Sequence, residues 1–250
     1  TLATTVVGSD ILLNTHANNL SGGVLFGGTL VNIRDIGLRN LNAGATIPDL
    51  AGVTNLRNLT LTFDNAPIAL PALALTASGN LNVTAGGSIT QTGAITVPGT
   101  TTLATTVAGS DILLNTLANN FTGAVTFAGA QSNIRDLGLR NVNAGATVTA
   151  LAGLTSLHNL TLQFDNAPVI LPTLTLTAGG SLNVTAGGAI TDSGNLIVSG
   201  TTTLAPGANN IALDNANDFI GTVSIANGSD VTLNDINALK AMGTVSEGYK

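Results

Sequence analysis

Residues 181–191 read "SLNVTAGGAIT", and residues 80–90 read "NLNVTAGGSIT". The correspondence extends along the chain, because Thr1–Thr101 aligns with Thr102–Thr202 without a gap and most positions are identical. A third copy begins at Thr203 with "TLAPGANNIALDNANDFIGTV", after the loss of three residues. We therefore predict a repeat architecture with copy 1 at 1–101, copy 2 at 102–202 and a partial copy 3 at 203–250.

Short runs with alternating apolar and polar residues recur within each copy, separated by Gly, Asn, Asp and Pro, which is typical of strands joined by turns. In "LNVTA" the side chains of Leu81 and Val83 fall on one face, and those of Asn82 and Thr84 on the other. Corresponding strands recur roughly every 20–22 residues, a period that fits a solenoid of short strands. The sequence predicts an all-β fold, a parallel β-helix (β-solenoid) with about five coils in each 101-residue copy.

The corners of these coils have their own sequence signals. "AGG" after a strand and "FDNAP" at 63–67 and 164–168 supply small, turn-forming residues. The stretches 50–61 and 151–162 are different, since leucine recurs there with leucine-rich-repeat spacing, but only once per copy. We expect an apolar bend or a short helical turn that leads into a strand, in preference to a leucine-rich solenoid.

The composition excludes several function classes. Only 8% of residues are charged, and the net charge of −6 with seven basic residues leaves no basic footprint for nucleic acid or an anionic membrane. The longest apolar run, "IALPALAL", is far shorter than the ~20 residues of a membrane helix, so we expect no membrane insertion. The chain lacks cysteine, which excludes disulfides and thiolate metal sites.

Charged residues recur at matching positions of both copies, whereas an active site is ordinarily present once. We predict turn or ladder roles for the aspartates and an Arg–Asp pair within a coil for the arginines; these residues are Asp10 and Asp111, Asp35 and Asp136, Asp64 and Asp165, and Arg34, Arg39, Arg135 and Arg140. The two histidines share no site, because His16 aligns with Leu117 and His158 aligns with Arg57. We predict no enzyme activity, no catalytic residue, no cofactor and no metal site.

A binding module is the alternative from another function class, with a solenoid face that contacts a polysaccharide or ice. Regular Thr-x-Thr ladders suit ice, but "TLT" at 60–62 becomes "TLQ" at 161–163. Aromatic side chains on which sugars stack are scarce, with one Tyr and no Trp. "AGGSIT" also lacks the aspartate of calcium-binding "GGxGxD" repeats.

The segments "GSLNVTAGGAITDSGNLIVSGTTTLA" and "NIALDNANDFIGTVSIANGSDVTLND" resemble the repeat region of filamentous-haemagglutinin-like adhesins, the large exoproteins of bacterial two-partner secretion systems. The resemblance covers nearly the whole chain and is weakest over the "IRDLGLRN" to "LAGLTSL" segment. The family's secretion motifs "NPNG" and "NPNL" do not occur. The resemblance implies a right-handed parallel β-helix that is secreted or displayed on the surface of a Gram-negative bacterium.

The expected function is therefore a structural shaft segment of a large surface adhesin with a role in adhesion, biofilm or cell contact. Expected partners are adjacent repeats of the same polypeptide, the outer-membrane transporter during secretion and, through other regions, a host-surface or matrix polysaccharide; we expect a monomer. The tail from about 240 holds both lysines and the only Glu, Met and Tyr, so we predict that 240–250 leaves the β-helix.

Overall fold

The computed structural model describes residues 1–148 and 151–245, and these contain β-strands and two short 3-10 helices. The chain divides into two compact units, Thr1–Gln131 and Ser132–Lys250. Within the described ranges there is no helix of the length and hydrophobicity needed to cross a membrane.

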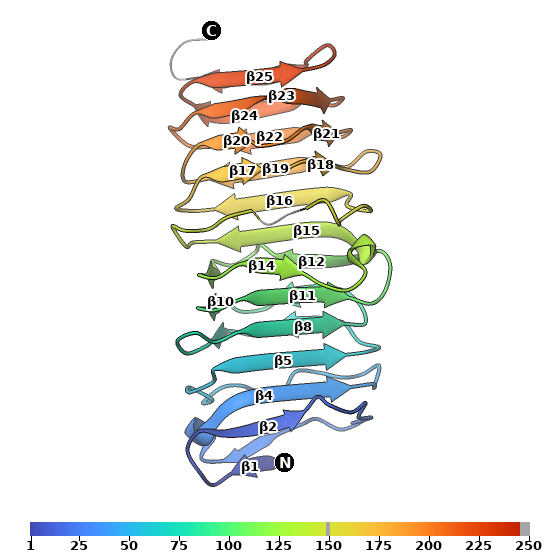
Figure 1. Ribbon diagram of the computed structural model, residues 1–250, viewed down its shortest axis with the longest axis vertical. Coiled ribbons are helices and arrows are strands. Elements are labelled where there is room, and N and C mark those ends of the chain that lie inside the picture. The colour runs from blue at the N-terminus through green and yellow to red at the C-terminus, as the bar shows by residue number, and fades with distance from the viewer. Residues whose placement is uncertain (149–150, 246–250) are drawn as a thin grey trace. The chain divides into compact units, whose positions relative to one another are not determined.

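The N-terminal unit consists of parallel strands that stack in sheets (Figure 1). Its strands are β1 (Leu2–Thr4), β2 (Ser9–Leu13), β3 (Phe26–Gly28), β4 (Ile33–Asn40), β5 (Asn58–Phe63), β6 (Ile68–Leu70), β7 (Leu73–Ala74), β8 (Leu81–Ala85), β9 (Ile89–Gln91), β10 (Ile95–Val97), β11 (Thr101–Thr105), β12 (Ser110–Leu114), β13 (Asn120–Phe121) and β14 (Val125–Phe127). The 3-10 helix η1 spans Leu30–Asn32, and η2 spans Gln131–Asn133. In this unit the strand orders are β14-β11-β8-β5-β4-β2, β13-β10-β7, β12-β9-β6 and β1-β3.

A regular coil has three strands on three sheets, because β5, β6 and β7 lie in different sheets and β8 returns to the sheet of β5. Leu59 pairs with Leu81 and Leu81 with Thr101, so these coils are 22 and 20 residues long, as predicted. Longer coils occur near the start, where Ile11 pairs with Ile36 and is 25 residues from it. The unit is a parallel β-solenoid, consistent with a right-handed parallel β-helix.

The 101-residue copy does not contain a whole number of coils. Four steps lead up one sheet from β2 through β4, β5 and β8 to β11. The counterpart of β2 one copy later, β12, lies in the next sheet with β9 and β6. A copy therefore contains four coils and one further face, not about five coils, because several corners are longer than the period of "LNVTA" suggests.

The C-terminal unit repeats this architecture. Its strands are β15 (Ile134–Asn141), β16 (Asn159–Phe164), β17 (Val169–Leu171), β18 (Leu174–Thr175), β19 (Leu182–Ala186), β20 (Ile190–Asp192), β21 (Leu196–Val198), β22 (Thr202–Ala205), β23 (Ile211–Phe219), β24 (Val223–Gly228), β25 (Val231–Asp235) and β26 (Ala241–Val245). In this unit the orders are β26-β24-β22-β19-β16-β15 and β17-β20-β23-β21-β18, with β25 paired to β23.

The core of each unit is a set of apolar rows that run from coil to coil. In the N-terminal unit Leu38, Leu61, Val83 and Leu103 occupy one row, and all are at most 2% exposed. The alternation predicted for "LNVTA" is confirmed, since Leu81 and Val83 are buried whereas Asn82 is exposed. Apolar contact between equivalent residues of successive coils therefore replaces the single core of a globular domain.

The leucine-rich stretches are apolar bends, as expected. Leu154 N–H donates to Leu151 O at 2.9 Å, and Leu157 N–H donates to Leu154 O at 3.1 Å, so two consecutive turns precede β16. All three leucines are at most 4% exposed. The leucine spacing thus reflects turns that point one side chain each into the core.

The prediction that the chain leaves the β-helix at 240 is wrong for the part of the tail that the structure describes. Ala241–Val245 form β26, which pairs with β24 through Val223↔Ala241 and Ser224↔Met242. Parallel pairing requires extended backbone more than a particular side chain, so Met242 fits the sheet although it departs from the repeat pattern. The predicted behaviour of 246–250 lies outside the described residues.

Candidate functional site

A ladder of side-chain hydrogen bonds links successive coils of the N-terminal unit. Asp35 Oδ1 accepts from the backbone N–H and the side-chain amide of Asn58, both at 3.1 Å. Asn58 Oδ1 accepts from Asn80 N–H at 3.0 Å, and Asn80 Oδ1 accepts from Thr100 N–H at 2.8 Å and from its hydroxyl at 2.9 Å. Each oxygen satisfies a backbone donor of the next coil, which confirms the predicted ladder role of Asp35.

The C-terminal unit has the same ladder at the positions one copy later. Asp136 Oδ1 accepts from the backbone and side-chain amides of Asn159 at 3.0 Å. Asn159 Oδ1 accepts from Ser181 N–H at 3.0 Å, and Ser181 Oγ accepts from Thr201 N–H at 3.2 Å. The ladder is a structural device that occurs twice, which is unlike a single active site.

The arginines pair mainly between coils, so the prediction of pairing within a coil is correct for only part of the ion pairs. Equivalent residues of neighbouring parallel strands lie about 4.8 Å apart on one face, whereas consecutive residues of a strand point to opposite faces. Two ion pairs do lie within a coil, as predicted: Arg34 with Asp35 (3.8 Å) and Arg135 with Asp136 (3.3 Å). The pairs between coils are Arg34 with Asp10 (2.7 Å), Arg39 with Asp64 (2.8 Å), Arg57 with Asp35 (Nε to Oδ1, 3.0 Å) and Arg140 with Asp165 (2.7 Å).

Asp35 has a perturbed pKa that follows from this pairing. Partial burial acts to raise the pKa of its carboxyl group, but hydrogen bonds from Arg57 and Asn58 and the attraction of Arg57 lower it below the ordinary value of 3.8. The hydrogen bond to Asp35 in turn raises the pKa of Arg57. Both groups are therefore charged at neutral pH, and neither is poised for proton transfer there.

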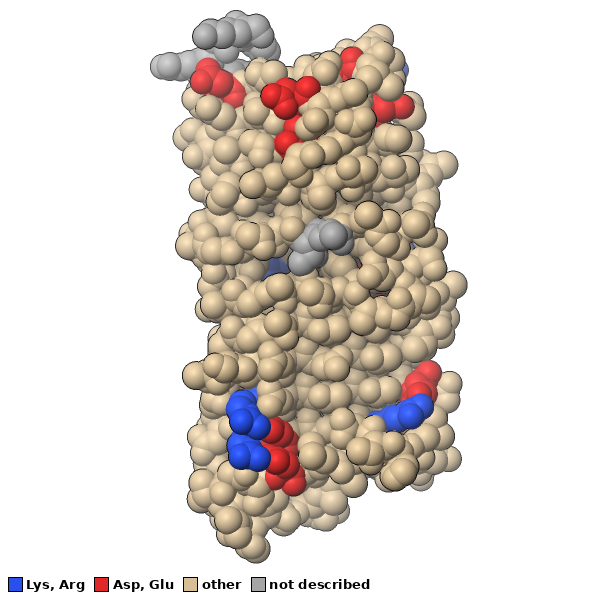
Figure 2. Space-filling model, in the orientation of Figure 1, with Lys and Arg blue, Asp and Glu red and all other residues tan. Residues whose placement is uncertain are grey.

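Charged side chains are sparse on the face that Figure 2 shows. In the N-terminal unit, basic and acidic side chains meet there in mixed clusters, in keeping with the Arg–Asp pairs above. Most of that face is uncharged, and in the C-terminal unit the charged side chains visible on it are almost all acidic.

The histidines do not form a site with the aspartates. His16 is exposed, and its carbonyl accepts from Asn18 Nδ2 at 3.1 Å. His158 Nδ1 lies 3.2 Å from Thr177 Oγ1. Within residues 1–148 and 151–245, no group of three or more His, Asp or Glu side chains is arranged to hold a metal ion.

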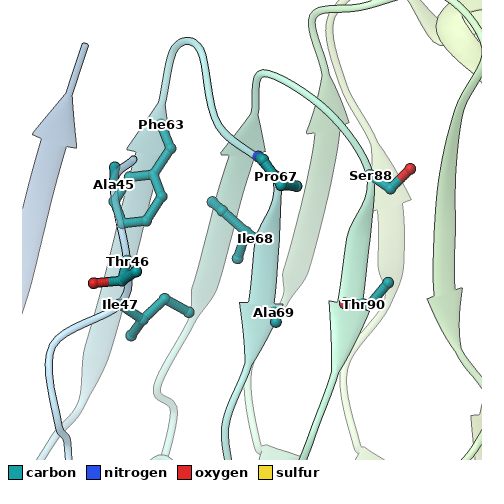
Figure 3. A pocket seen from close by; sticks show the side chains of 9 residues that line it. All are labelled: Ala45, Thr46, Ile47, Phe63, Pro67, Ile68, Ala69, Ser88 and Thr90. Carbon is teal, nitrogen blue, oxygen red and sulfur yellow. The ribbon is translucent and has the colours of Figure 1, made fainter. Parts of the chain in front are cut away.

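A pocket of about 410 Å³ lies in the N-terminal unit beside β6 and β9 (Figure 3). Nine residues line it: Ala45, Thr46, Ile47, Phe63, Pro67, Ile68, Ala69, Ser88 and Thr90. None of them is charged, and Ser88 Oγ accepts from Asp111 N–H at 3.0 Å. The pocket therefore has the apolar character of a binding hollow without a charged group that could orient a substrate.

The outward row across the larger sheet of the N-terminal unit is polar but irregular. Thr60 pairs with Asn82, and Asn82 with Thr102, while in the next outward row Thr84 pairs with Ala104. A Thr-x-Thr pair at 60 and 62 therefore becomes Asn-x-Thr and then Thr-x-Ala in successive coils. This irregularity weighs against an ice-like lattice on that sheet.

Two buried asparagines are important for the corners, and the sequence reasoning missed them. Asn119 is completely buried; its Oδ1 accepts from Ile95 N–H at 2.9 Å, and its Nδ2 donates to Leu114 O at 2.8 Å. Asn217 is also buried, with Oδ1 accepting from Leu196 N–H at 2.9 Å. The signal was present, because "ANNF" at 118–121 and "ANDF" at 216–219 place Asn two residues before a buried Phe.

The comparisons with known proteins find one family model, described as repeats of unknown function (DUF5649), which matches residues 56–128 and 157–226. The two matches begin 101 residues apart, so the family repeat recurs with the period of the copies, and together they cover more than half of the chain. No curated protein and no solved structure matches the chain. The chain belongs to this family of repeats of unknown function.

Proposed function

We propose that the chain is a structural shaft segment of a large, secreted bacterial surface adhesin of the filamentous-haemagglutinin-like type. In this role it performs no catalysis, binds no cofactor and holds a distal binding or effector region away from a Gram-negative cell. It passes an outer-membrane transporter during secretion and contacts adjacent repeats of the same polypeptide.

The observation that supports this proposal most directly is the repetition of the coil-to-coil ladder. Asp35, Asn58 and Asn80 in one unit have counterparts at Asp136, Asn159 and Ser181 in the other, and each rung ties a coil to the next. Solenoids of this kind gain length by adding repeats, because each coil contacts only its neighbours. The low charge and the lack of cysteine suit a chain that folds after export.

Insertion of one additional 101-residue copy at the Thr101–Thr102 junction tests the shaft role. With coils about 4.8 Å apart, four coils and one face should increase the maximum dimension from small-angle scattering by about 20 Å. A variant that lacks residues 102–202 should be shorter by a similar amount. A maximum dimension that is unchanged in both variants would contradict the proposal.

A glycan-binding assay distinguishes the proposed shaft function from that of a polysaccharide-binding module. We expect the purified chain, immobilised on beads, to retain no more matrix polysaccharide or host-cell glycan than beads carrying an unrelated β-solenoid of similar charge. Specific, saturable retention by the chain itself would favour the binding-module alternative.

A further inference from the structure

The parallel ladder of the N-terminal unit has an internal break. β6 pairs with β9 and β7 with β10, and within residues 1–131 neither strand has a partner on its other side. The segment at 43–55 belongs to the preceding coil, yet none of its hydrogen bonds within the described chain reaches residues 66–75. The ladder resumes beyond the break, where Thr76 N–H donates to Leu56 O at 2.8 Å.

The sequence of the segment at 43–55 explains why it does not continue the ladder. Pro48 has no N–H group to donate. Ala45 N–H donates to Asn42 O at 3.1 Å, and Val53 N–H donates to Leu50 O at 3.0 Å, so the chain bonds to itself in turns. Such a segment cannot present the evenly spaced donors and acceptors that a parallel neighbour needs. The break recurs one copy later, where β17 and β18 are again the outermost strands of their sheet.

The free side of β6 presents backbone groups that a further strand could bind. Ile68 N–H donates to Ser88 O at 3.0 Å, and Thr92 N–H donates to Leu70 O at 2.7 Å. Ile68 and Leu70 thus direct their backbone polar groups toward β9, and Ala69 between them directs its N–H and C=O to the opposite side. No hydrogen bond joins these two groups to the segment at 43–55. An open strand edge of this kind is a template for strand addition.

The pocket beside β6 lies in the break and limits what can bind there. Figure 3 shows residues 45–47 on one side of the pocket and residues 67–69 on the other. Its volume of about 410 Å³ is typical of a ligand-binding pocket, and none of its lining residues is charged. The polar side chains of the lining are the hydroxyl groups of Thr46, Ser88 and Thr90. A suitable occupant is therefore uncharged and places apolar side chains in the pocket.

We propose that the break beside β6 is an interaction surface for an extended, uncharged peptide segment of a partner protein. The peptide accepts a hydrogen bond from Ala69 N–H and donates one to Ala69 O, and it thereby continues the sheet of β12, β9 and β6 by one strand. Its apolar side chains alternate with polar ones, because only one face of the added strand meets the pocket. This interaction goes beyond the shaft function, since it involves a different protein and a site within the stack of coils.

The C-terminal unit indicates how this surface can be closed. Ile170 of β17 occupies the position of Ala69, because Ile170 pairs with Thr191 as Ala69 pairs with Thr90. The Ile170 side chain is 55% exposed, so a larger residue is accommodated at this position. A hollow of about 310 Å³ at this second break lies beside β18. Ala69→Ile is therefore a variant that should obstruct the edge of β6 without disturbing the core.

Hydrogen exchange and peptide binding to the full chain test the proposal. In the free chain, the amide of Ala69 should exchange at least about tenfold faster than those of Ile68 and Leu70. The probe is the uncharged peptide acetyl-Ser-Ile-Thr-Val-Ser-amide. At saturating peptide, exchange at Ala69 should slow by at least about fivefold. Ala69→Ile should raise the dissociation constant by about tenfold or more, whereas Ala212→Ile, the same substitution on the outward face of β23, should leave it unchanged.

Methylated peptides distinguish strand addition from occupation of the pocket by apolar side chains alone. One carries N-methyl groups at Ile and Val, and the other carries one at the central Thr, so each removes the backbone donors of one edge of the peptide. At least one of them should lose binding. Equal binding of both and of the parent peptide would overturn the proposal in favour of a small apolar ligand. Absence of peptide binding, equal binding to Ala69→Ile, or an Ala69 amide that is already as protected as Ile68 would also overturn it.

Discussion

The two units contain the same hydrogen-bonded ladder but differ in the side chain of its third rung. Asn80 provides the acceptor of the third rung in the N-terminal unit, whereas Ser181 provides it in the C-terminal unit. The residue before the second rung is Arg57 in one unit, where it pairs with Asp35, and His158 in the other, where it contacts Thr177. The feature common to both units is thus a side-chain oxygen acceptor at each rung together with the buried apolar rows of the core. The charge of the residue before the second rung, Arg57 or His158, differs between the units.

This comparison predicts that changes to features common to both units have the largest effects. Val83 and its counterpart Val184 are completely buried in the inward rows. Val83→Asp places a carboxylate among apolar side chains of three coils, which should cost at least about 4 kcal/mol or unfold the unit. Urea unfolding followed by circular dichroism measures the loss. The control Asn82→Asp points outward from the same strand and should change the stability by less than about 0.5 kcal/mol.

The corner glycines are the next common feature. A methyl group on Gly86 would overlap the carbonyl group of Asp64, and the same holds for Gly187 and Asp165. Gly86→Ala should destabilise the protein by about 2 kcal/mol, as expected for overpacking against the backbone. Gly22→Ala is the matched control, because nothing lies within 4 Å of its added methyl group. Equal melting temperatures for the two variants would show that the corner can relax.

How much of this architecture the sequence could predict depends on the range of the interaction. The strand faces follow from local alternation, as in "LNVTA", and are predicted correctly; the repeat follows from the identity of residues 101 positions apart. The pairing of Arg57 with Asp35 was not, because it depends on the register between coils and hence on corner lengths that no local pattern determines. Asn119 was missed for a related reason: an asparagine between strands is typical of a turn, and only the folded corner shows that it is buried.

The third rung tests whether the ladder needs an oxygen or a particular residue. Asn80→Ala removes the acceptor for the backbone N–H of Thr100 and should cost about 1 kcal/mol in urea unfolding. Asn80→Ser introduces the side chain that Ser181 has in the C-terminal unit, where the oxygen accepts from Thr201 N–H at 3.2 Å. The serine variant should therefore retain most of the native stability. If serine were as harmful as alanine, the two ladders would not be equivalent.

The smallest effect is expected at Arg57, where the two units differ. Because the pKa of Asp35 is lowered from 3.8 in the folded protein, the unfolded chain binds the proton more readily. The contribution of this carboxylate to stability is thus fully present above about pH 4 and decreases as the pH falls through the folded pKa. Arg57→Gln removes the charge and a hydrogen bond that lower the pKa of Asp35, so this pKa should rise toward 3.8 and the acid-dependent part of the stability should shrink. Arg57→Lys keeps the charge and should retain most of the pKa shift.

Carboxyl titration by NMR and urea unfolding at pH 2.5 and pH 7 distinguish the variants. An unchanged pKa of Asp35 in Arg57→Gln would mean that Arg57 does not lower it and that the hydrogen bonds from Asn58 do. The C-terminal unit has the equivalent amide, Asn159, at the same rung.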